Sequence, residues 1–212
     1  SGGRLVRYDP EKHHRRSIRL KGYDYTQSGA YFVTMCTHER ECLFGGVTNG
    51  QDQLSRLGEI VYEEWFRTAE LRPYVCLYPD EFVVMPNHIH GIIWIVESTS
   101  PTASGTGTAA PRPDNPAMRP GPSGRMEQFG RPVSGSIPTI VRAFKAATTK
   151  RINEQRNTPG APVWQRNYYE HVIRNNKSLL RIRAYILANP DNWIRDPEYR
   201  AQIAQQANDS SG

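Results

Sequence analysis

The chain has 212 residues, of which 37% are hydrophobic and 23% charged, and its formal net charge at pH 7 is +6. This composition predicts one globular domain with a core of its own, and the absence of any long apolar run excludes a membrane-spanning helix. Three cysteines without CxxC spacing exclude a disulfide scaffold and a zinc knuckle. No signal-peptide pattern is found, so we expect a cytoplasmic protein.

The first 28 residues are polar and basic and show no apolar period, which predicts an arm that folds on a partner. Its most basic run, KHHRRSIRLKG, contains Arg15 and Arg16. A second basic cluster consists of Arg142, Lys145, Lys150 and Arg151. Such clusters suit a polyanion such as nucleic acid, although a solvated basic face explains the charge equally well.

Residues 30–38, AYFVTMCTH, are rich in β-branched and aromatic side chains and predict the first strand. Apolar residues then recur at helical spacing from Leu57 to Leu71, which predicts a first helix that ends before Pro73. Two apolar runs, YVCLY and EFVVM, come next, and a Pro-Asn turn leads into HIHGIIWIVE. An antiparallel pair of strands is the simplest interpretation of this pattern.

Residues 98–135 consist mainly of Ser, Thr, Gly, Pro and Ala. This low-complexity insertion within the domain cannot bury enough apolar surface to offset its ordering entropy. Beyond it, residues 137–153 predict a second helix, residues 161–175 predict extended structure, and residues 177–189 predict a third helix that stops at Pro190.

The order strand, helix, two strands, helix, strand is that of a ferredoxin-like α+β sandwich. We therefore expect a four-stranded antiparallel sheet with helices on one face and an additional C-terminal helix. The expected domain covers residues 29–197, between the basic arm and a polar tail at 198–212.

Within HIHGIIWIVE, His88 and His90 point to one face of the predicted strand, and Ile89 points to the other. Two neighbouring imidazoles suit a divalent metal ion near pH 7. The pair alone is a weak signal, because one exposed histidine beside one hydrogen-bonded histidine is the commoner arrangement.

In the third helix, Tyr185 and Asn189 are four residues apart and share a face, and Arg181 lies one turn earlier. These groups suit a site where phosphate is attacked, with tyrosine as nucleophile, asparagine as metal ligand and arginine as charge clamp. The structural alternatives are a helix cap for Asn189, an interfacial aromatic for Tyr185 and a solvated charge for Arg181.

Three blocks, VVMPNHIHGIIWI, VWQRNYYEHVIRN and YILANP, occur in this order between residues 31 and 197. Together they resemble the REP-associated tyrosine transposases, a branch of the HUH single-tyrosine transposases. The resemblance implies the ferredoxin-like fold, with His88 and His90 binding Mg²⁺ or Mn²⁺. It also implies Tyr185 as nucleophile and Asn189 as third metal ligand, in place of the glutamine of many insertion-sequence relatives.

The resemblance further implies cleavage, and rejoining, of single-stranded DNA through a 5′-phosphotyrosine. The expected substrates are hairpins of repetitive extragenic palindromes, and the expected enzyme is a nucleoid-associated bacterial monomer whose tyrosine helix acts in cis. The residues expected to contact DNA are Arg15, Arg16, Arg142, Lys145, Lys150, Arg151, Trp164, Tyr168, His171 and Arg181.

Several alternatives stay open at this point. Tyr168 and Tyr169 are rival nucleophiles, although neither has an asparagine four residues on. His171 is equally well explained as a structural histidine. A non-catalytic module that binds single-stranded nucleic acid is a different class of function, and a replication-type HUH nickase is a third.

Overall fold

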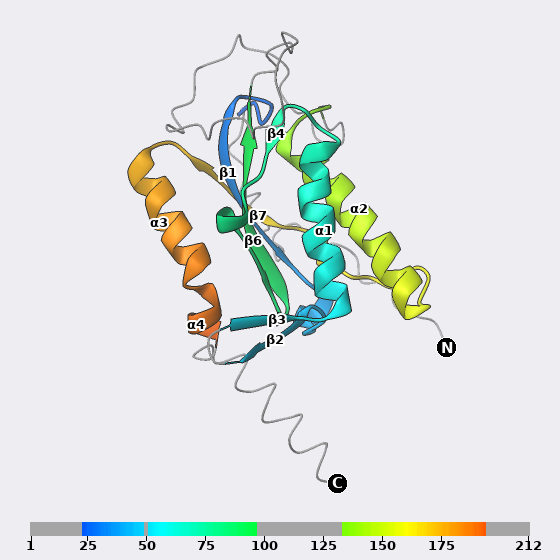
Figure 1. Ribbon diagram of the computed structural model, residues 1–212. Coiled ribbons are helices and arrows are strands. Elements are labelled where there is room, and N and C mark those ends of the chain that lie inside the picture. The colour runs from blue at the N-terminus through cyan, green and yellow to red at the C-terminus, as the bar shows by residue number, and fades with distance from the viewer. Residues whose placement is uncertain (1–22, 49–50, 97–132, 194–212) are drawn as a thin grey trace, which may run out of the picture.

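The computed structural model describes residues 23–48, 51–96 and 133–193. Its centre is an antiparallel sheet in the order β4-β6-β1-β7, with β5 also paired to β6. The strands of this sheet are β1 (Gly29–Cys36), β4 (Val75–Cys76), β5 (Phe82–Met85), β6 (His88–Ile95) and β7 (Tyr169–Ile173). A separate hairpin of β2 (Gly45–Thr48) and β3 (Gln51–Leu54) lies at one end of the sheet (Figure 1).

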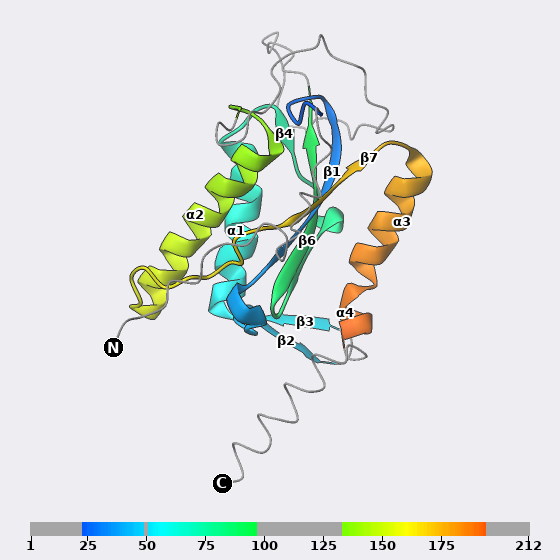
Figure 2. The same cartoon turned by 180° about the vertical axis from the view of Figure 1, so that it is seen from behind.

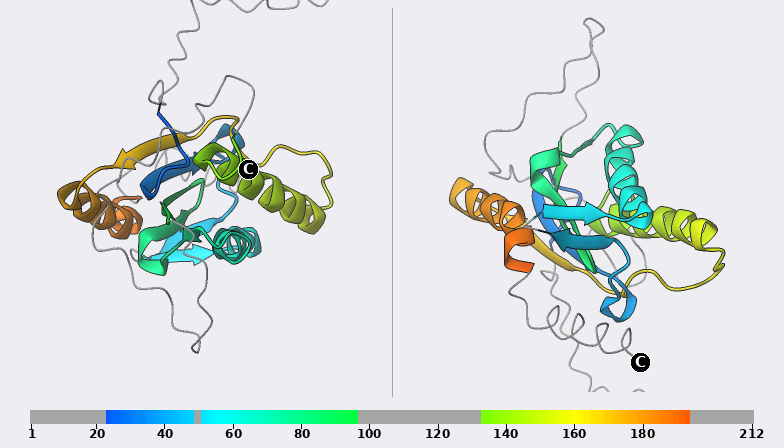
Figure 3. Two further views of the ribbon diagram at one scale, coloured as in Figure 1. Left: turned by 90° about the horizontal axis from the view of Figure 1, so that it is seen from above. Right: turned by 60° about the horizontal axis from the view of Figure 1, so that its bottom comes forward.

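Helices cover both faces of the sheet. On one face, α1 (Arg56–Glu70) and α2 (Ile137–Arg156) lie side by side, and α3 (Asn176–Leu187) covers the other face (Figures 1 and 2). The short helix α4 (Asn189–Trp193) follows α3. The view from above separates these layers, with the sheet between α3 and the α1-α2 pair (Figure 3). Two single 3-10 turns complete the described elements, η1 (His38–Arg40) and η2 (Pro79–Glu81).

Side-chain alternation along β6 divides the core into two parts. Ile89, Ile93 and Ile95 belong to the part beneath α1 and α2, whereas Ile92 and Trp94 belong to the part beneath α3. His88 and His90 are separated from Ile92 and Trp94 by an even number of residues along β6, so their side chains also face the α3 side.

Gly91 allows α1 to approach β6 closely. A Cβ atom at this position would lie 2.4 Å from Cζ2 of Trp65, and the Trp65 ring itself stacks on Phe82 with centroids 4.5 Å apart. A larger residue would therefore push α1 away from the strand that carries the histidines.

Helix α3 begins at the N-cap Asn175, whose side-chain oxygen accepts a 2.8 Å hydrogen bond from the Ser178 N–H. The predicted apolar stripe is confirmed as buried against the sheet: Leu179, Ile182 and Ile186. The prediction of one helix over 177–189 is wrong at its end, because α3 stops at Leu187 and a new helix begins. Pro190 is the second residue of α4, where its missing N–H needs no partner.

The predicted α+β class is confirmed, and the order β7-β1-β6-β4 is that of a ferredoxin-like sheet. Two segments are less regular than predicted: YVCLY forms only the two-residue β4, and residues 161–175 form β7 and an isolated bridge between Trp164 and Thr37. The β2-β3 hairpin is not among the predicted strands.

Parts of the predicted domain plan lie outside the described residues: 1–22 of the arm, 98–132 of the insertion, and the whole tail 198–212. Cys36, Cys42 and Cys76, all in the described ranges, form no disulfide there. In the ranges that the structure describes, no helix combines the length and apolar character that crossing a bilayer demands.

Candidate active site

Two histidines meet at the start of β6, directly after the turn that joins it to β5. The ring centroids of His88 and His90 are 4.6 Å apart, and the rings are inclined by 70°. Only 9% of His88 and 4% of His90 is exposed. The predicted convergence of the two imidazoles is confirmed, and Ile89 between them lies in the opposite core.

Each imidazole is oriented by a hydrogen bond at Nδ1. The His88 Nδ1 lies 2.7 Å from Oδ1 of Asn87, and the His90 Nδ1 lies 2.8 Å from Oγ1 of Thr34. Thr34 is the β1 partner of His90 in the sheet register. Because the Asn87 oxygen can only accept, the His88 Nδ1 carries the proton and its Nε2 keeps a lone pair. The Thr34 hydroxyl can donate or accept, so it orients the His90 ring with either tautomer.

Burial keeps His90 neutral. Loss of water lowers the pKa of His90 to about 3, with a smaller contribution from the neighbouring His88. A neutral imidazole offers a nitrogen lone pair to a proton or a cation at neutral pH. His90 is therefore a ligand or hydrogen-bond acceptor in this site, and not a positive charge.

Tyr185 reaches the histidine pair from α3. Its hydroxyl oxygen lies 3.2 Å from Nε2 of His90, with the ring centroids 5.1 Å apart. Phe32 of β1 stacks on His90 and meets the Tyr185 ring edge-on. The Tyr185 side chain is nevertheless 47% exposed, so a phosphate in solution can approach the hydroxyl.

A buried ion pair fixes α3 on the sheet, and no pattern in the sequence pointed to it. Glu81 of η2 is fully buried, and its Oε1 accepts a 2.7 Å hydrogen bond from Nε of Arg183. Nη2 of Arg183 lies 2.6 Å from the same oxygen, although without the alignment of a hydrogen bond. Oε2 of Glu81 accepts a 2.6 Å hydrogen bond from the Trp94 indole of β6. Arg183 precedes Tyr185 by two residues, so this contact restrains the helix beside the tyrosine.

The sequence predicts Asn189 on the same helix as Tyr185, one turn later. In the structure α3 ends at Leu187, and Asn189 is the first residue of α4. It is buried, and its side chain makes no hydrogen bond within the described ranges. The other end of α4 lies against the histidines, since the ring centroids of Trp193 and His88 are 5.6 Å apart.

The two imidazoles suit a divalent cation that accepts nitrogen ligands. Both Nδ1 atoms are engaged in orienting hydrogen bonds, so each imidazole would use Nε2 for a cation, and Nε2 of His90 contacts the Tyr185 hydroxyl. Asn189 is buried at the start of α4, and its carboxamide has no hydrogen-bond partner among the described residues. These donors do not select a particular ion. Clusters of three or more His, Cys, Asp and Glu side chains suited to a metal do not occur in the described ranges.

Of the ten residues predicted to contact DNA, two lie on the α3 side with the histidines. Arg181 is exposed on α3, one turn before Tyr185, and His171 is exposed on β7. Burial lowers the pKa of His171, and the positive charges of Arg174 and Arg181 lower it further. Both arginines therefore lie within electrostatic reach of this histidine.

Six others lie on or beside α2, on the opposite side of the sheet: Arg142, Lys145, Lys150, Arg151, Trp164 and Tyr168. Arg142 and Lys150 are exposed. The Lys145 ammonium donates to the carbonyls of Gln165 and Asn167 and lies 5.7 Å from the centroid of the Tyr168 ring. These contacts hold the segment before β7 against α2. Arg15 and Arg16 lie outside the described residues.

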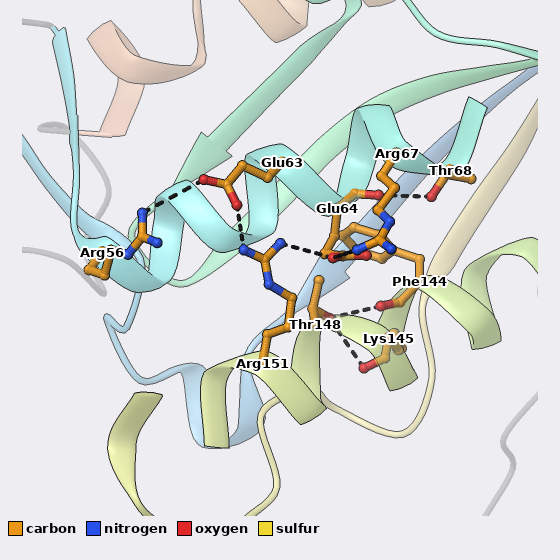
Figure 4. Close-up of polar contacts among 9 residues, drawn as sticks. All are labelled: Arg56, Glu63, Glu64, Arg67, Thr68, Phe144, Lys145, Thr148 and Arg151. Carbon is orange, nitrogen blue, oxygen red and sulfur yellow. Dashed lines mark hydrogen bonds and ion pairs between the residues drawn. The ribbon is translucent and has the colours of Figure 1, made fainter. Parts of the chain in front are cut away.

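Trp164 and Arg151 have structural partners. The Trp164 ring is buried in the core and its indole N–H donates to Thr148, so base stacking on this ring is excluded and that prediction is wrong. Arg151 bridges α2 to α1 by pairing with Glu63 and Glu64, as Figure 4 shows. Both terminal nitrogens of its guanidinium therefore pair with carboxylates of α1.

The chain is similar to known proteins in sequence and in fold. No family model matches the chain. The chain is 42% identical over 194 residues to an uncharacterized protein of Haemophilus influenzae, and the alignment covers 92% of this chain and 98% of that protein. Among solved structures, a REP-associated tyrosine transposase bound to a REP hairpin matches with a TM-score of 0.50 and 18% identity, over 80% of this chain and 71% of the transposase.

A transposase candidate from Deinococcus radiodurans R1 matches with a TM-score of 0.40 and 16% identity, over 79% of this chain and 94% of that protein, a likeness too weak to bear on this one. At 18% identity, the similarity to the REP-associated transposase concerns the fold. The fold implied by the resemblance in the sequence is therefore confirmed.

Proposed function

From the fold and the geometry of the site, we propose that the chain is a metal-dependent, single-stranded DNA endonuclease and transposase. By sequence, the chain belongs to the same family as the Haemophilus influenzae protein. The observation that supports the proposal most directly is the contact between the Tyr185 hydroxyl and Nε2 of His90, 3.2 Å apart. It brings a half-exposed phenol, the group that would attack, to a buried pair of imidazoles.

In the proposed reaction, the Tyr185 oxygen attacks the phosphorus of a DNA phosphodiester. A bond forms between this oxygen and phosphorus while the bond from phosphorus to the 3′-oxygen breaks. The phenol proton leaves, and the departing 3′-oxygen gains a proton. The products are a 5′-phosphotyrosine and a free 3′-hydroxyl, and since the phosphoester count is unchanged, the reverse step can rejoin a strand without an energy source.

The chain's own groups orient the reactants. Thr34 and Asn87 fix the two imidazoles, and Phe32 supports the rings of both His90 and Tyr185. The residues that would hold Mg²⁺ or Mn²⁺ are His88, His90 and Asn189. When bound there, such an ion would polarise a non-bridging oxygen of the phosphate.

The proposed substrate is hairpin DNA of repetitive palindromes, because the transposase with the similar fold is bound to a REP hairpin. Residues 29–197 form the proposed catalytic unit. The Tyr185 hydroxyl contacts His90 of the same chain. This contact favours a monomer that acts in cis.

A denaturing gel tests the proposal. The protein is incubated with Mg²⁺ or Mn²⁺ and single-stranded hairpin oligonucleotides taken from repeats that flank its gene. We expect a covalent protein-DNA band that is lost in Tyr185→Phe and in His88→Ala. Tyr62→Phe is the matched control, because Tyr62 is a similarly exposed tyrosine on α1, and it should keep the band.

Other outcomes distinguish the rival functions. Hairpin binding without any covalent band, with either metal, would leave a non-catalytic nucleic-acid-binding module. A band that forms on a replication-origin sequence and not on repeat hairpins would favour a nickase.

A further inference from the structure

Strand β7 exposes a second aromatic side chain beside the histidine pair. In the sheet register, Tyr169 of β7 and His90 of β6 are both partners of Thr34 on β1, so all three side chains lie on the same face. Glu170 is buried and points to the opposite face. In the described part of the sheet, β7 pairs with β1 alone, which places Tyr169 at an edge.

Phe32 joins this tyrosine to the proposed nucleophile. The Phe32 ring is buried, and it meets the rings of Tyr169 and Tyr185 edge-on, each with centroids 6.2 Å apart. Tyr169 and Tyr185 are 42% and 47% exposed. Two accessible tyrosine rings thus flank one buried ring, and only Tyr185 has its hydroxyl on a histidine among the described residues.

Positive charge accompanies these rings. β7 leads directly into α3 (Figure 2), and the exposed Arg174 and Arg181 belong to this connection and helix. No acidic residue occurs from His171 to Asn189, and Glu170 faces the other side of the sheet. Tyr169 shares its strand with His171, which lies within electrostatic reach of Arg174 and Arg181. An exposed aromatic ring and exposed cations on one strand and the helix after it suit single-stranded DNA, since bases stack on the ring and phosphates meet the cations.

We propose that Tyr169 is the stacking platform for a nucleotide adjoining the phosphate that Tyr185 attacks, and that Arg174 and Arg181 contact the neighbouring phosphates. This inference rests on the proposed function. It assigns Tyr169 a role in positioning the single strand, and it removes Tyr169 from the candidates for nucleophile.

Fluorescence anisotropy tests the proposal with two labelled oligonucleotides. One is a repeat hairpin with a six-nucleotide single-stranded extension, and the other is the same hairpin without the extension. Tyr169→Ala should weaken binding of the extended hairpin about 5- to 160-fold, the range that loss of one stacked base produces, and should leave the blunt hairpin unaffected. Tyr169→Phe keeps the ring and should bind like the unaltered protein.

Two further variants guard against a folding defect. Tyr169→Leu keeps apolar bulk on the strand without an aromatic face and should behave like Tyr169→Ala. Tyr62→Ala removes a similarly exposed tyrosine that packs on Phe66, away from the site, and should bind both oligonucleotides normally.

The inference is overturned if Tyr169→Ala binds the extended hairpin like the unaltered protein, or weakens both oligonucleotides equally. It is also overturned if Tyr169→Phe loses affinity or the covalent band, since that would assign the role to the hydroxyl. If the unaltered protein binds neither oligonucleotide, the proposed function itself fails. The two failures are therefore distinguishable.

Discussion

The buried ion pair between Arg183 and Glu81 offers a direct test of how α3 is held on the sheet. The Glu81 side chain is fully buried, and 20% of the Arg183 side chain is exposed. Arg183→Met removes the guanidinium but keeps the unbranched stem and a comparable helix propensity. Loss of one partner of a buried ion pair costs about 3–5 kcal/mol, and the partial exposure of Arg183 favours the lower end, about 3 kcal/mol.

Urea unfolding followed by circular dichroism measures this loss, provided that the slope with denaturant is unchanged. Arg181→Met is the matched control, because Arg181 is an exposed arginine two residues earlier on the same helix. We expect this control to stay within about 0.5 kcal/mol of the unaltered protein. If Arg183→Met unfolds at the same urea concentration as Arg181→Met, the ion pair does not hold the helix.

Three other perturbations test separate parts of the structure. Thr34→Val removes the hydrogen bond at Nδ1 of His90, and calorimetric titration with Mn²⁺ should show an affinity about 10- to 100-fold lower. Gly91→Ala should lower the free energy of unfolding by about 1–3 kcal/mol, because the new methyl group overlaps Trp65. Burial lowers the pKa of Lys145 from 10.5 to about 8, so the unfolded chain binds more protons between these values. The free energy of unfolding should therefore rise with pH across that window relative to Lys145→Met.

The part of the site that follows from local periodicity could be predicted from the sequence. Alternation along a strand brings His88 and His90 together and sends Ile89 to the other core, and helical spacing buries Leu179, Ile182 and Ile186. These relations depend only on residues within one element, so a single sequence is enough.

The rest depends on contacts between distant residues. Glu81 and Arg183 are 102 positions apart, and nothing near PDEF marks its glutamate as fully buried. Similarly, the role of Phe32 under three rings follows from the register of β1 with β6 and β7. Such pairings are set by the tertiary fold, which a local pattern does not contain.

Two errors at element boundaries have identifiable causes. Pro190 predicts the end of a helix, but proline is equally compatible with the first turn of a new helix, and Pro190 is the second residue of α4. The hairpin of β2 and β3 was missed although Asn49 and Gly50 form a dipeptide typical of tight hairpin turns. Its strands are short and partly polar, and so they lack the apolar alternation that was used to find the others.

The central claim is that Tyr185 forms the bond to DNA, and mass spectrometry of the trypsin-digested covalent product tests it most directly. Trypsin separates Tyr185, in the peptide 184–195, from Tyr168 and Tyr169, in the peptide 167–174. We predict a 5′-phosphonucleotide on the peptide that contains Tyr185. A nucleotide on the peptide 167–174 instead would contradict the assignment of the nucleophile.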